Sequence, residues 1–425
     1  MSSTTKSPKV RYSVACGVAF CFALLLSLAG LLASPVGASP PPSPTALPEV
    51  ADKPGETAAP LPKIHAWTWM VADADNGEVL AGSNWHWTMP PASTLKTLTA
   101  LTLVPRLDLD SQYLAQASDA GAEGSHVGVK AGSHYTVRDL FHGLLMPSGN
   151  DAASALANAY GGWPRTVAAM NDEAARLGAK DTKVLNPSGL DEPGQMTTAY
   201  DLALIMRASL KVPDLMQMYS LHDVMWPTEE PTDPKKPRGQ VKIWTEDRLI
   251  LNYYPGALAG KTGFTSQAGR TFVSAVQRDG RTLIVVLMRT AQSTEVTSKR
   301  LYDWGFANID KVKPVDYLVD PQAPAGEIVR GTAATYDASG NLTSALPSQT
   351  EPDTGIGAGT MLLMALLLAG GVVVALRVRV IRRNSAAGGR GPAVRQPTTA
   401  AAPIPPDNSE TVDLRKVEQD SSRLF

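Results

Sequence analysis

Ser93 and Lys96 are the residues of this chain whose types and spacing best suit nucleophilic catalysis. Residues three apart on a helix lie on one face, so the lysine amine can reach the serine hydroxyl. A serine hydroxyl is a poor nucleophile until a base removes its proton. Lys96 can be that base only if its pKa falls well below the usual value of about 10.4, which burial or a second cation such as Lys261 would cause. The alternative is that Ser93 caps a helix and Lys96 extends along its surface.

A Ser-Gly-Asn triplet at positions 148–150 offers two more polar side chains. It falls between two predicted helices, where the glycine allows a tight turn. Ser148 could relay a proton between Lys96 and a leaving amine, and Asn150 could hydrogen-bond the amide of an acyl group. The structural alternative is an ordinary N-cap for a helix that starts at Asp151.

The stretch Lys261, Thr262 and Gly263 is predicted to lie on a strand at a sheet edge. An edge strand can pair with an extended peptide, and glycine permits close approach of that peptide backbone. The Lys261 amine and the Thr262 hydroxyl could then hold a terminal carboxylate. The backbone N–H groups of Ser93 and Phe264 would stabilise the developing oxyanion. A solvated strand end with a turn glycine is the alternative.

Order along the chain distinguishes these motifs from chance copies. Residues 3–6 form a second Ser-x-x-Lys motif, and residues 339–341 form a second Ser-Gly-Asn triplet. Lys-Thr-Gly occurs once, at 261–263, and selects the pair of motifs that precedes it inside a foldable region. Ser-x-x-Lys, a Ser-x-Asn triplet and Lys-Thr-Gly are together typical of serine enzymes that acylate on penicillin.

Composition argues against several other classes of function. The 425 residues carry a formal net charge of −1 with no dense basic patch, so we expect no nucleic-acid partner. The two cysteines, Cys16 and Cys21, lie in an apolar N-terminal run, which leaves the rest of the chain without a disulfide or a thiol nucleophile. The six histidines show no metal-ligand spacing, so we predict neither a metal site nor a cofactor.

Both ends of the chain are predicted to interact with a membrane. Basic residues precede an apolar run over 14–33 and a small-residue site at 36–38, which indicates a signal peptide over 1–38. An uncleaved anchor is the alternative. Residues 355–376 carry no charge and would form a helix of about 33 Å, long enough to span the hydrocarbon core, unless they form a buried core helix. Four arginines follow, so the positive-inside rule places the tail at 377–425 in the cytoplasm and the middle of the chain outside.

The hydrophobic pattern predicts strands at both ends of a central domain and helices between them. Strands are expected, with hairpin turns at 75–77 and 278–281, over residues 66–74, 78–81, 271–276 and 282–288. Helices are expected over residues 92–104, 136–145, 151–160, 164–177, 198–210 and 295–307. One sheet built from both ends, with helices on its faces, would give a mixed α/β domain over 64–313.

The segments outside these elements lack such patterns. Residues 39–63 are rich in Pro, Ala and Ser and are predicted to form an extended spacer. Residues 225–238 are rich in Pro and charge and are predicted to form a surface loop. Residues 314–354 are expected to be an extracytoplasmic stalk, and residues 377–425 a disordered tail.

With these residues in place, the chain resembles the low-molecular-mass penicillin-binding D-alanyl-D-alanine carboxypeptidases, serine peptidase family S11. The resemblance covers residues 64–313 and is carried by the segments PPASTLK at 90–96, LMPSGNDAA at 145–153, NPSGLD at 186–191 and GKTGFT at 260–265. It implies a β-lactamase/transpeptidase-like fold, an antiparallel sheet with helices on both faces, outside a bacterial cell membrane. It also implies that the substrate is the stem peptide of peptidoglycan and that β-lactam antibiotics acylate the enzyme. Ser93 would be acylated with release of the terminal D-alanine, and water would complete the hydrolysis.

The chain departs from this family at two places. Many relatives carry a β-rich C-terminal domain and an amphipathic anchor, whereas this chain has a predicted stalk and a predicted spanning helix. Some relatives have histidine where Phe264 stands. Because the role of this residue is a backbone N–H, we expect the difference to change only substrate fit or pH profile.

Two other functions stay open at this point. A class A β-lactamase shares the three motifs but needs a deacylating glutamate three residues before Leu-Asn, and Thr182 occupies that position before Leu185 and Asn186. A wall-binding scaffold that signals through its cytoplasmic tail is the non-enzymatic alternative. The sequence does not distinguish carboxypeptidase from endopeptidase or transpeptidase activity, and it does not indicate an oligomeric state.

Overall fold

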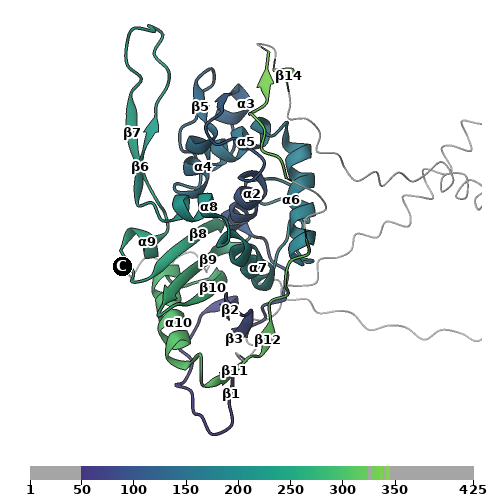
Figure 1. The fold of residues 1–425 in the computed structure, drawn as a ribbon, viewed down its shortest axis with the longest axis vertical. Coiled ribbons are helices and arrows are strands. Elements are labelled where there is room, and N and C mark those ends of the chain that lie inside the picture. The colour runs from purple at the N-terminus through teal and green to yellow at the C-terminus, as the bar shows by residue number, and fades with distance from the viewer. Residues whose placement is uncertain (1–48, 324–327, 338–339, 345–425) are drawn as a thin grey trace, which may run out of the picture. The chain divides into compact units, whose positions relative to one another are not determined.

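The structure, a computed structural model, describes residues 49–323, 328–337 and 340–344 (Figure 1). Among these residues no helix is both long enough and apolar enough to cross a membrane. The predicted signal peptide at 1–38, the predicted span at 355–376 and the predicted tail at 377–425 lie outside the described residues.

A six-stranded antiparallel sheet is built from both ends of the described chain, as the sequence predicts (Figure 1). The strand order is β12-β3-β2-β10-β9-β8, which leaves β8 at one edge. Its strands are β2 (Ala66–Asp73), β3 (Glu78–Ser83), β8 (Ala257–Thr265), β9 (Gly269–Arg278), β10 (Arg281–Thr290) and β12 (Asp316–Tyr317). Both predicted hairpins are confirmed. At the second, Asp279 and Gly280 have φ of 49° and 77°, the two positive values that a tight type I′ turn requires.

Helices cover both faces of the sheet because its central strands are apolar on both sides. Val285 and Leu287 of β10 belong to one buried cluster, which includes Leu301 of α10 (Thr294–Asn308). Ile284, Val286 and Met288 face the larger cluster on the opposite side. That cluster is contributed mainly by α2 (Lys96–Leu103), α4 (Val137–Leu145), α5 (Asn150–Ala159), α6 (Trp163–Leu177) and α7 (Ala199–Ser209). The predicted mixed α/β fold with helices on both faces is confirmed.

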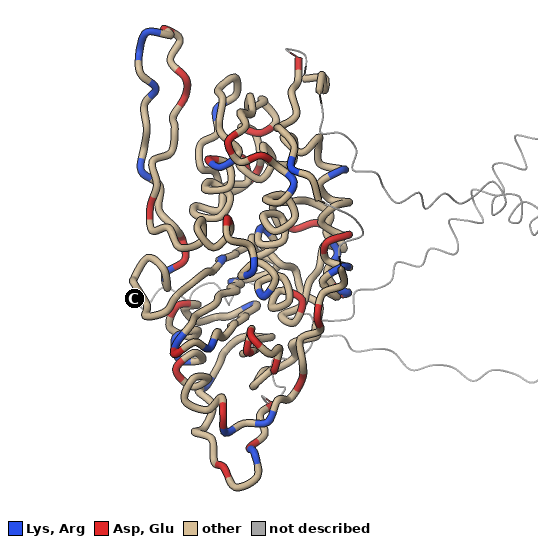
Figure 2. Tube along the Cα trace, in the orientation of Figure 1, with Lys and Arg blue, Asp and Glu red and all other residues tan. Residues whose placement is uncertain are grey.

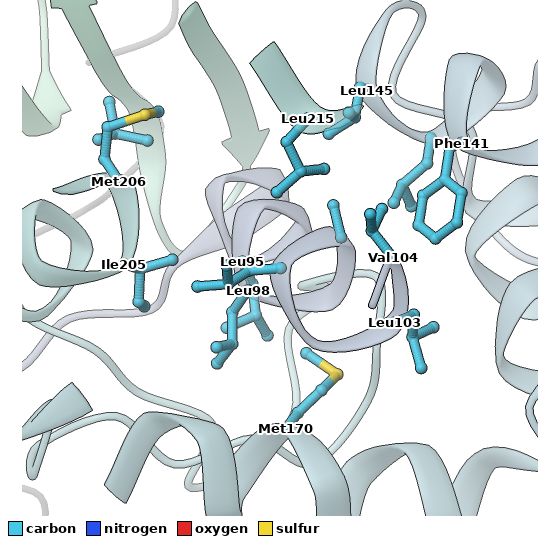
Figure 3. Close-up of a cluster of buried hydrophobic side chains, with 14 of the residues drawn as sticks. Leu95, Leu98, Leu103, Val104, Phe141, Leu145, Met170, Ile205, Met206 and Leu215 are labelled. Atoms are coloured by element: carbon cyan, nitrogen blue, oxygen red, sulfur yellow. The ribbon is translucent and has the colours of Figure 1, made fainter. Parts of the chain in front are cut away.

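Helix α2 is the centre of the helical side of the molecule. All eight of its residues are buried, including the lysine at its first position. Figure 3 shows the side chains around it, among them Leu95, Leu98, Leu103, Phe141, Met170 and Ile205. The first turn differs from the prediction, because Ala92–Leu95 form a 3-10 turn, η1, ahead of the α-helix.

The folded body extends beyond the predicted boundaries at 64 and 313. Strand β12 pairs with β3, and β1 (Ala51–Asp52) pairs with β11 (Val312–Lys313). Further along, the Ala334 N–H donates to the Ala159 carbonyl over 2.8 Å. Where the structure describes residues of the predicted spacer at 39–63 and of the predicted stalk at 314–354, these contacts make them part of the folded body, contrary to the prediction. A strand of two residues is too short to show an alternation of apolar and polar side chains. It is recognised only from its pairing with another strand.

A second difference concerns the predicted loop at 225–238. Its first residues belong to β6 (Asp223–Pro227), which pairs with β7 (Gln240–Trp244) in a long hairpin that projects from the body in Figure 1. The hairpin is anchored by Trp226, whose buried ring stacks on Tyr135 with the centroids 5.1 Å apart. Proline and charged residues dominate the hairpin tip, so the alternation of apolar and polar side chains in the two strands cannot be recognised in the sequence.

Short elements complete the described chain. They are β4 (Gln112–Leu114), α3 (Ala117–Ala120), β5 (His134–Thr136), α8 (Pro213–Tyr219), α9 (Arg248–Leu251), β13 (Thr335–Tyr336) and β14 (Leu342–Ser344).

The loop at 186–191 lies very close to η1 at Gly189. Its φ is +83°, and a Cβ would lie 1.9 Å from the Ala92 carbonyl oxygen. Gly132 has a similar φ of +78° but no atom within 4 Å of its Cβ position. We expect Gly132→Ala to cost about 1–2 kcal/mol of unfolding free energy from its backbone alone, and Gly189→Ala to cost clearly more because the loop must move. Denaturant unfolding of both variants measures the difference; equal losses would contradict the close contact.

Candidate active site

The Lys96 amine lies at the centre of a polar cluster inside the helical core. Its Nζ is 2.9 Å from Ser93 Oγ, 2.6 Å from Asn150 Oδ1 and 2.8 Å from the Ser188 carbonyl oxygen. The lysine is fully buried, whereas Ser93 is only partly buried at the surface of the site. When the amine is neutral it has a lone pair, so the Ser93 hydroxyl can donate its proton along the same contact.

The environment of Lys96 favours that neutral form. Burial lowers the pKa of Lys96 well below its ordinary value, and the positive charge of Lys261 lowers it further. The carboxylates of Glu246 and Asp151 oppose this shift. Both causes that the sequence suggested, burial and a second cation at Lys261, are therefore present, and the alternative of a surface-extended lysine is wrong.

Lys261 forms a second buried amine on the edge strand β8. Its Nζ donates to Ser148 Oγ over 2.8 Å and to the Thr262 carbonyl over 2.9 Å. Burial lowers the pKa of Lys261 to about 8, against the opposing effect of Glu246. This value lets Lys261 carry its charge at neutral pH.

The Ser-Gly-Asn triplet presents one side chain to each lysine. Ser148 bonds to Lys261, and Asn150 bonds to Lys96. The residue that caps α5 is Gly149, with no side-chain hydrogen bond, so the predicted alternative of a polar N-cap is wrong. Ser148 has a φ of +63°, a conformation that costs a non-glycine residue about 1–3 kcal/mol. The bond to Lys261 helps to hold it there.

Asn150 differs from its predicted role. Its Oδ1 accepts from Lys96, and its Nδ2 donates to the Glu123 carbonyl over 2.6 Å. Each end of the amide thus has one hydrogen-bond partner inside the protein. The next residue, Asp151, is buried and accepts from the N–H groups of residues 127–129, which fixes the loop beneath Asn150. In this structure Asn150 positions the Lys96 amine.

Strand β8 passes directly beside Ser93. A Cβ on Gly263 would lie 2.8 Å from the Ser93 backbone nitrogen and 2.4 Å from Thr271 Oγ1, so only glycine fits. The following residue, Phe264, has a side chain that is 67% exposed. The segments that carry the two predicted oxyanion donors, the N–H groups of Ser93 and Phe264, therefore face each other across Gly263.

The loop at 186–191 contributes backbone groups that the sequence motifs did not assign. Asn186 Oδ1 accepts from the Gly189 N–H over 2.9 Å and shapes the loop so that the Ser188 carbonyl faces Lys96. Asp191 accepts from the Thr265 hydroxyl over 2.7 Å and so ties the loop to the end of β8. Every residue has a backbone carbonyl oxygen, so the residue types in the sequence could not identify this contact.

Two acidic residues beside the site were also missed. Thr262 Oγ1 donates to Glu246 Oε2 over 3.0 Å, so the hydroxyl predicted to bind a substrate carboxylate already holds a carboxylate. Asp247 is buried, and burial raises its pKa to about 6. Glu246 and Asp247 lie fifteen or so residues before Thr262, in no recognisable motif, and only the fold brings them there.

The residue at the deacylating position of a class A β-lactamase lies elsewhere. Thr182 Oγ1 donates to Asp201 over 2.7 Å and is 2.8 Å from Thr197 Oγ1, next to the start of α7. Within residues 49–344, apart from the short undescribed gaps, no group of three His, Cys, Asp or Glu side chains is arranged to hold a metal ion.

Comparison with known proteins agrees with this geometry. The family model for D-alanyl-D-alanine carboxypeptidase matches residues 55–292, which include all three motifs. D-alanyl-D-alanine carboxypeptidase DacB2 of Mycobacterium tuberculosis is 42% identical over 278 residues, covering 64% of this chain and 89% of that protein. DacD of Escherichia coli is 32% identical over 267 residues, covering 59% of this chain and 66% of that protein.

Solved structures agree as well. A crystal structure of D-alanyl-D-alanine carboxypeptidase from Mycobacterium tuberculosis matches with a TM-score of 0.55 at 41% identity, over 62% of this chain and 97% of that one. A Streptomyces DD-transpeptidase matches with a TM-score of 0.55 at 25% identity, over 59% of this chain and all of that one. The family match extends over more than half of the sequence and includes the three motifs that form the site. The chain therefore belongs to the D-alanyl-D-alanine carboxypeptidase family of serine peptidases.

Proposed function

We propose that this protein removes the terminal D-alanine from the stem pentapeptide of peptidoglycan through an acyl-enzyme on Ser93. The observation that carries the proposal is the buried Lys96 amine 2.9 Å from the Ser93 hydroxyl, with the second amine, Lys261, bonded to Ser148. A neutral amine beside a hydroxyl is a general base for nucleophilic attack. The second amine, Lys261, is suited to bind a carboxylate when it is charged.

In the proposed acylation, Lys96 takes the proton of Ser93 as Oγ attacks the carbonyl of the penultimate D-alanine. The N–H groups of Ser93 and Phe264 stabilise the oxyanion. The C–N bond then breaks, and Ser148 passes a proton to the departing amine of D-alanine. Lys261 and the Thr262 hydroxyl hold the carboxylate of that residue, and the hydroxyl gives up its bond to Glu246 to do so. Water then attacks the Ser93 ester, and the Ser93 hydroxyl is regenerated.

This arrangement sets the direction of the substrate. Its reacting carbonyl lies at Phe264 and its terminal carboxylate lies at Thr262, so the peptide runs antiparallel to β8. Because β8 is an edge strand, it can pair with such an extended segment. A β-lactam, which carries an amide carbonyl and a carboxylate at a similar separation, would acylate Ser93 in the same orientation.

We further propose that the enzyme acts outside the bacterial cell membrane. Support comes from the sequence: a basic and apolar N-terminus over 1–38, and an uncharged segment over 355–376 that arginines follow. A membrane-held enzyme facing outward meets its wall substrate directly.

Substitutions at the proposed nucleophile and base test the assignment. We expect Ser93→Ala to abolish covalent labelling by a fluorescent penicillin and release of D-alanine. Lys96→Arg introduces a permanent cation that cannot act as a base, so acylation should slow by about 10²–10⁴-fold. Ser148→Ala should also slow acylation. Ser339→Ala, in the second Ser-Gly-Asn triplet, should leave the acylation rate unchanged. Labelling that survives in Ser93→Ala would contradict the proposal, provided that circular dichroism shows the variants folded.

The pH profile of acylation tests the division of labour between the lysines. The rate should rise with pH as Lys96 loses its proton, below the ordinary lysine range because its pKa is lowered. It should fall above pH of about 8, because Lys261 then loses the charge that holds the substrate carboxylate. Lys261→Arg should remove this alkaline fall, since arginine keeps its charge. An unchanged alkaline limb in that variant, measured by penicillin acylation rates, would exclude Lys261 as its source.

A further inference from the structure

Asp247 is a buried acid that the proposed mechanism does not use. It lies at the start of α9, where its Oδ1 accepts the Leu249 N–H over 2.9 Å. Its other oxygen, Oδ2, is buried and accepts no hydrogen bond from the residues that the structure describes. Figure 2 shows acidic and basic residues close together at the base of the hairpin β6–β7, where this segment begins. A helix cap accounts for one oxygen of Asp247 but not for the other.

The second oxygen of Asp247 lies against the strand that carries Lys261. A Cβ on Gly260 would be 2.2 Å from Asp247 Oδ2, so the carboxylate occupies the space that a side chain at 260 would need. Phe272 lies beside the same glycine and belongs to the cluster on the α10 side of the sheet. Adjacent residues of a strand point to opposite faces, so the Lys261 side chain leaves β8 on the other side, toward Ser148. Asp247 therefore lies directly behind the backbone that holds Lys261.

The two groups interact through their charges across this strand. Burial lowers the pKa of Lys261 to about 8, and the charges of Glu246 and Asp247 oppose this effect. Burial raises the pKa of Asp247 to about 6, against two backbone N–H groups and the charge of Lys261. Charges in a protein interior interact over several ångströms without a shared hydrogen bond, because little water screens them. The Asp247 carboxylate thus favours the protonated form of Lys261.

Glu246 cannot replace Asp247 in this role. It is exposed to solvent, and it holds the Thr262 hydroxyl that the substrate carboxylate must take over. Asp247 is buried away from the substrate, so its charge acts in the free enzyme and in the complex.

The other groups that face Asp247 do not neutralise it. From α10, Glu295 adds a negative charge that raises the pKa of Asp247 further, after burial. The Tyr302 hydroxyl on the same helix is neutral, because burial raises its pKa well above its ordinary value, and it bonds to Ser274 over 2.8 Å. The neighbouring Arg248 is exposed, so water screens its charge. Lys261 is therefore the buried cation that the Asp247 charge favours.

We propose that Asp247 is a positioning residue whose buried negative charge keeps Lys261 protonated when the substrate carboxylate binds. The inference rests on the proposed function, because it assumes that Lys261 holds this carboxylate. Between pH of about 6 and about 8, Asp247 is ionised and Lys261 is protonated. A buried carboxylate with an oxygen that lacks a hydrogen bond destabilises the folded state, and a neutral cap would avoid this cost. The charge at position 247 thus weakens the fold and strengthens the site.

Asp247→Asn tests this proposal, because asparagine keeps the cap oxygen and nearly the same shape without the charge. Penicillin acylation rates are measured against pH on the full-length protein in detergent. We expect the alkaline limb to move to lower pH by about one unit, the scale of a unit charge acting over several ångströms in a protein interior. The ratio of wild-type to variant rate should be close to one at pH of about 5.5 and about fivefold to tenfold at pH of about 9.

Thermal unfolding gives a second readout of opposite sign. Because the pKa of Asp247 is raised in the folded state, the wild-type protein loses stability as the pH rises from the ordinary aspartate range to about 6, and this loss persists at higher pH. Asp247→Asn removes the loss, so its unfolding temperature should exceed that of the wild type above pH of about 6. A residue with only a structural role would instead give a less stable variant.

Further variants show whether the effect passes through Lys261. Asp201→Asn neutralises another buried acid whose pKa burial raises to about 6, in the first turn of α7, and should leave the alkaline limb in place. When Lys261→Arg is already present, adding Asp247→Asn should not move the limb, because arginine keeps its charge. If Asp247→Asn does not fold, Asp247→Ser also caps α9 without a charge and gives the same test.

The outcomes separate this inference from the proposed function. An alkaline limb that Asp247→Asn leaves in place, a loss of rate that is equal at every pH, or an equal shift in Asp201→Asn would overturn the role of Asp247 alone. A wild-type alkaline limb that persists in Lys261→Arg would contradict the role of Lys261 in the proposed function, and this inference would fail with it.

Discussion

The burial of two lysine amines is the constraint on which the rest of this structure depends. Removing a cation from water is costly unless the group loses its proton or gains strong hydrogen bonds. Lys96 is held by three oxygen atoms and Lys261 by two. Burial lowers the pKa of both amines, and the charge of Lys261 lowers the pKa of Lys96 further. The Lys-Thr-Gly motif therefore helps to set the protonation of the Ser-x-x-Lys motif.

The fold supplies this burial from two different layers. Lys96 begins a helix that is buried on every side, and Lys261 lies on the edge strand of the sheet. The loop at 186–191 joins them, because its Ser188 carbonyl bonds to Lys96 and its Asp191 carboxylate bonds to Thr265 at the end of β8. Close backbone approaches hold the layers in place. Gly189 contacts the Ala92 carbonyl and Gly263 contacts the Ser93 amide at distances that exclude a side chain.

The same edge of the sheet explains why the site is open on one side. The strand β8 has a neighbour, β9, on one side only, so its other edge is available to a peptide. The hairpin β6–β7 does not pair with it but stands beside it and supplies a row of exposed side chains from Lys242 to Arg248.

The sequence by itself determined the features that depend on near neighbours. Ser93 and Lys96 are one turn apart, and the two predicted hairpins have turn residues that permit positive φ, so their geometry follows from local rules. The ordered motifs and the segments around them identified the family and the fold. The membrane segments at 1–38 and 355–376 stay predictions, because they lie outside the described residues.

Only the tertiary structure decided which groups meet across long distances in the chain. The two-residue strands β1 and β12 are too short to have a pattern, and their pairing partners lie more than two hundred residues away. Asn150 also holds Lys96, and Thr262 also holds Glu246, two contacts that the sequence did not predict. Hydrogen-bond partners of this kind depend on which donors and acceptors the packed core leaves within about 3 Å of each other, and no spacing along the sequence contains that information.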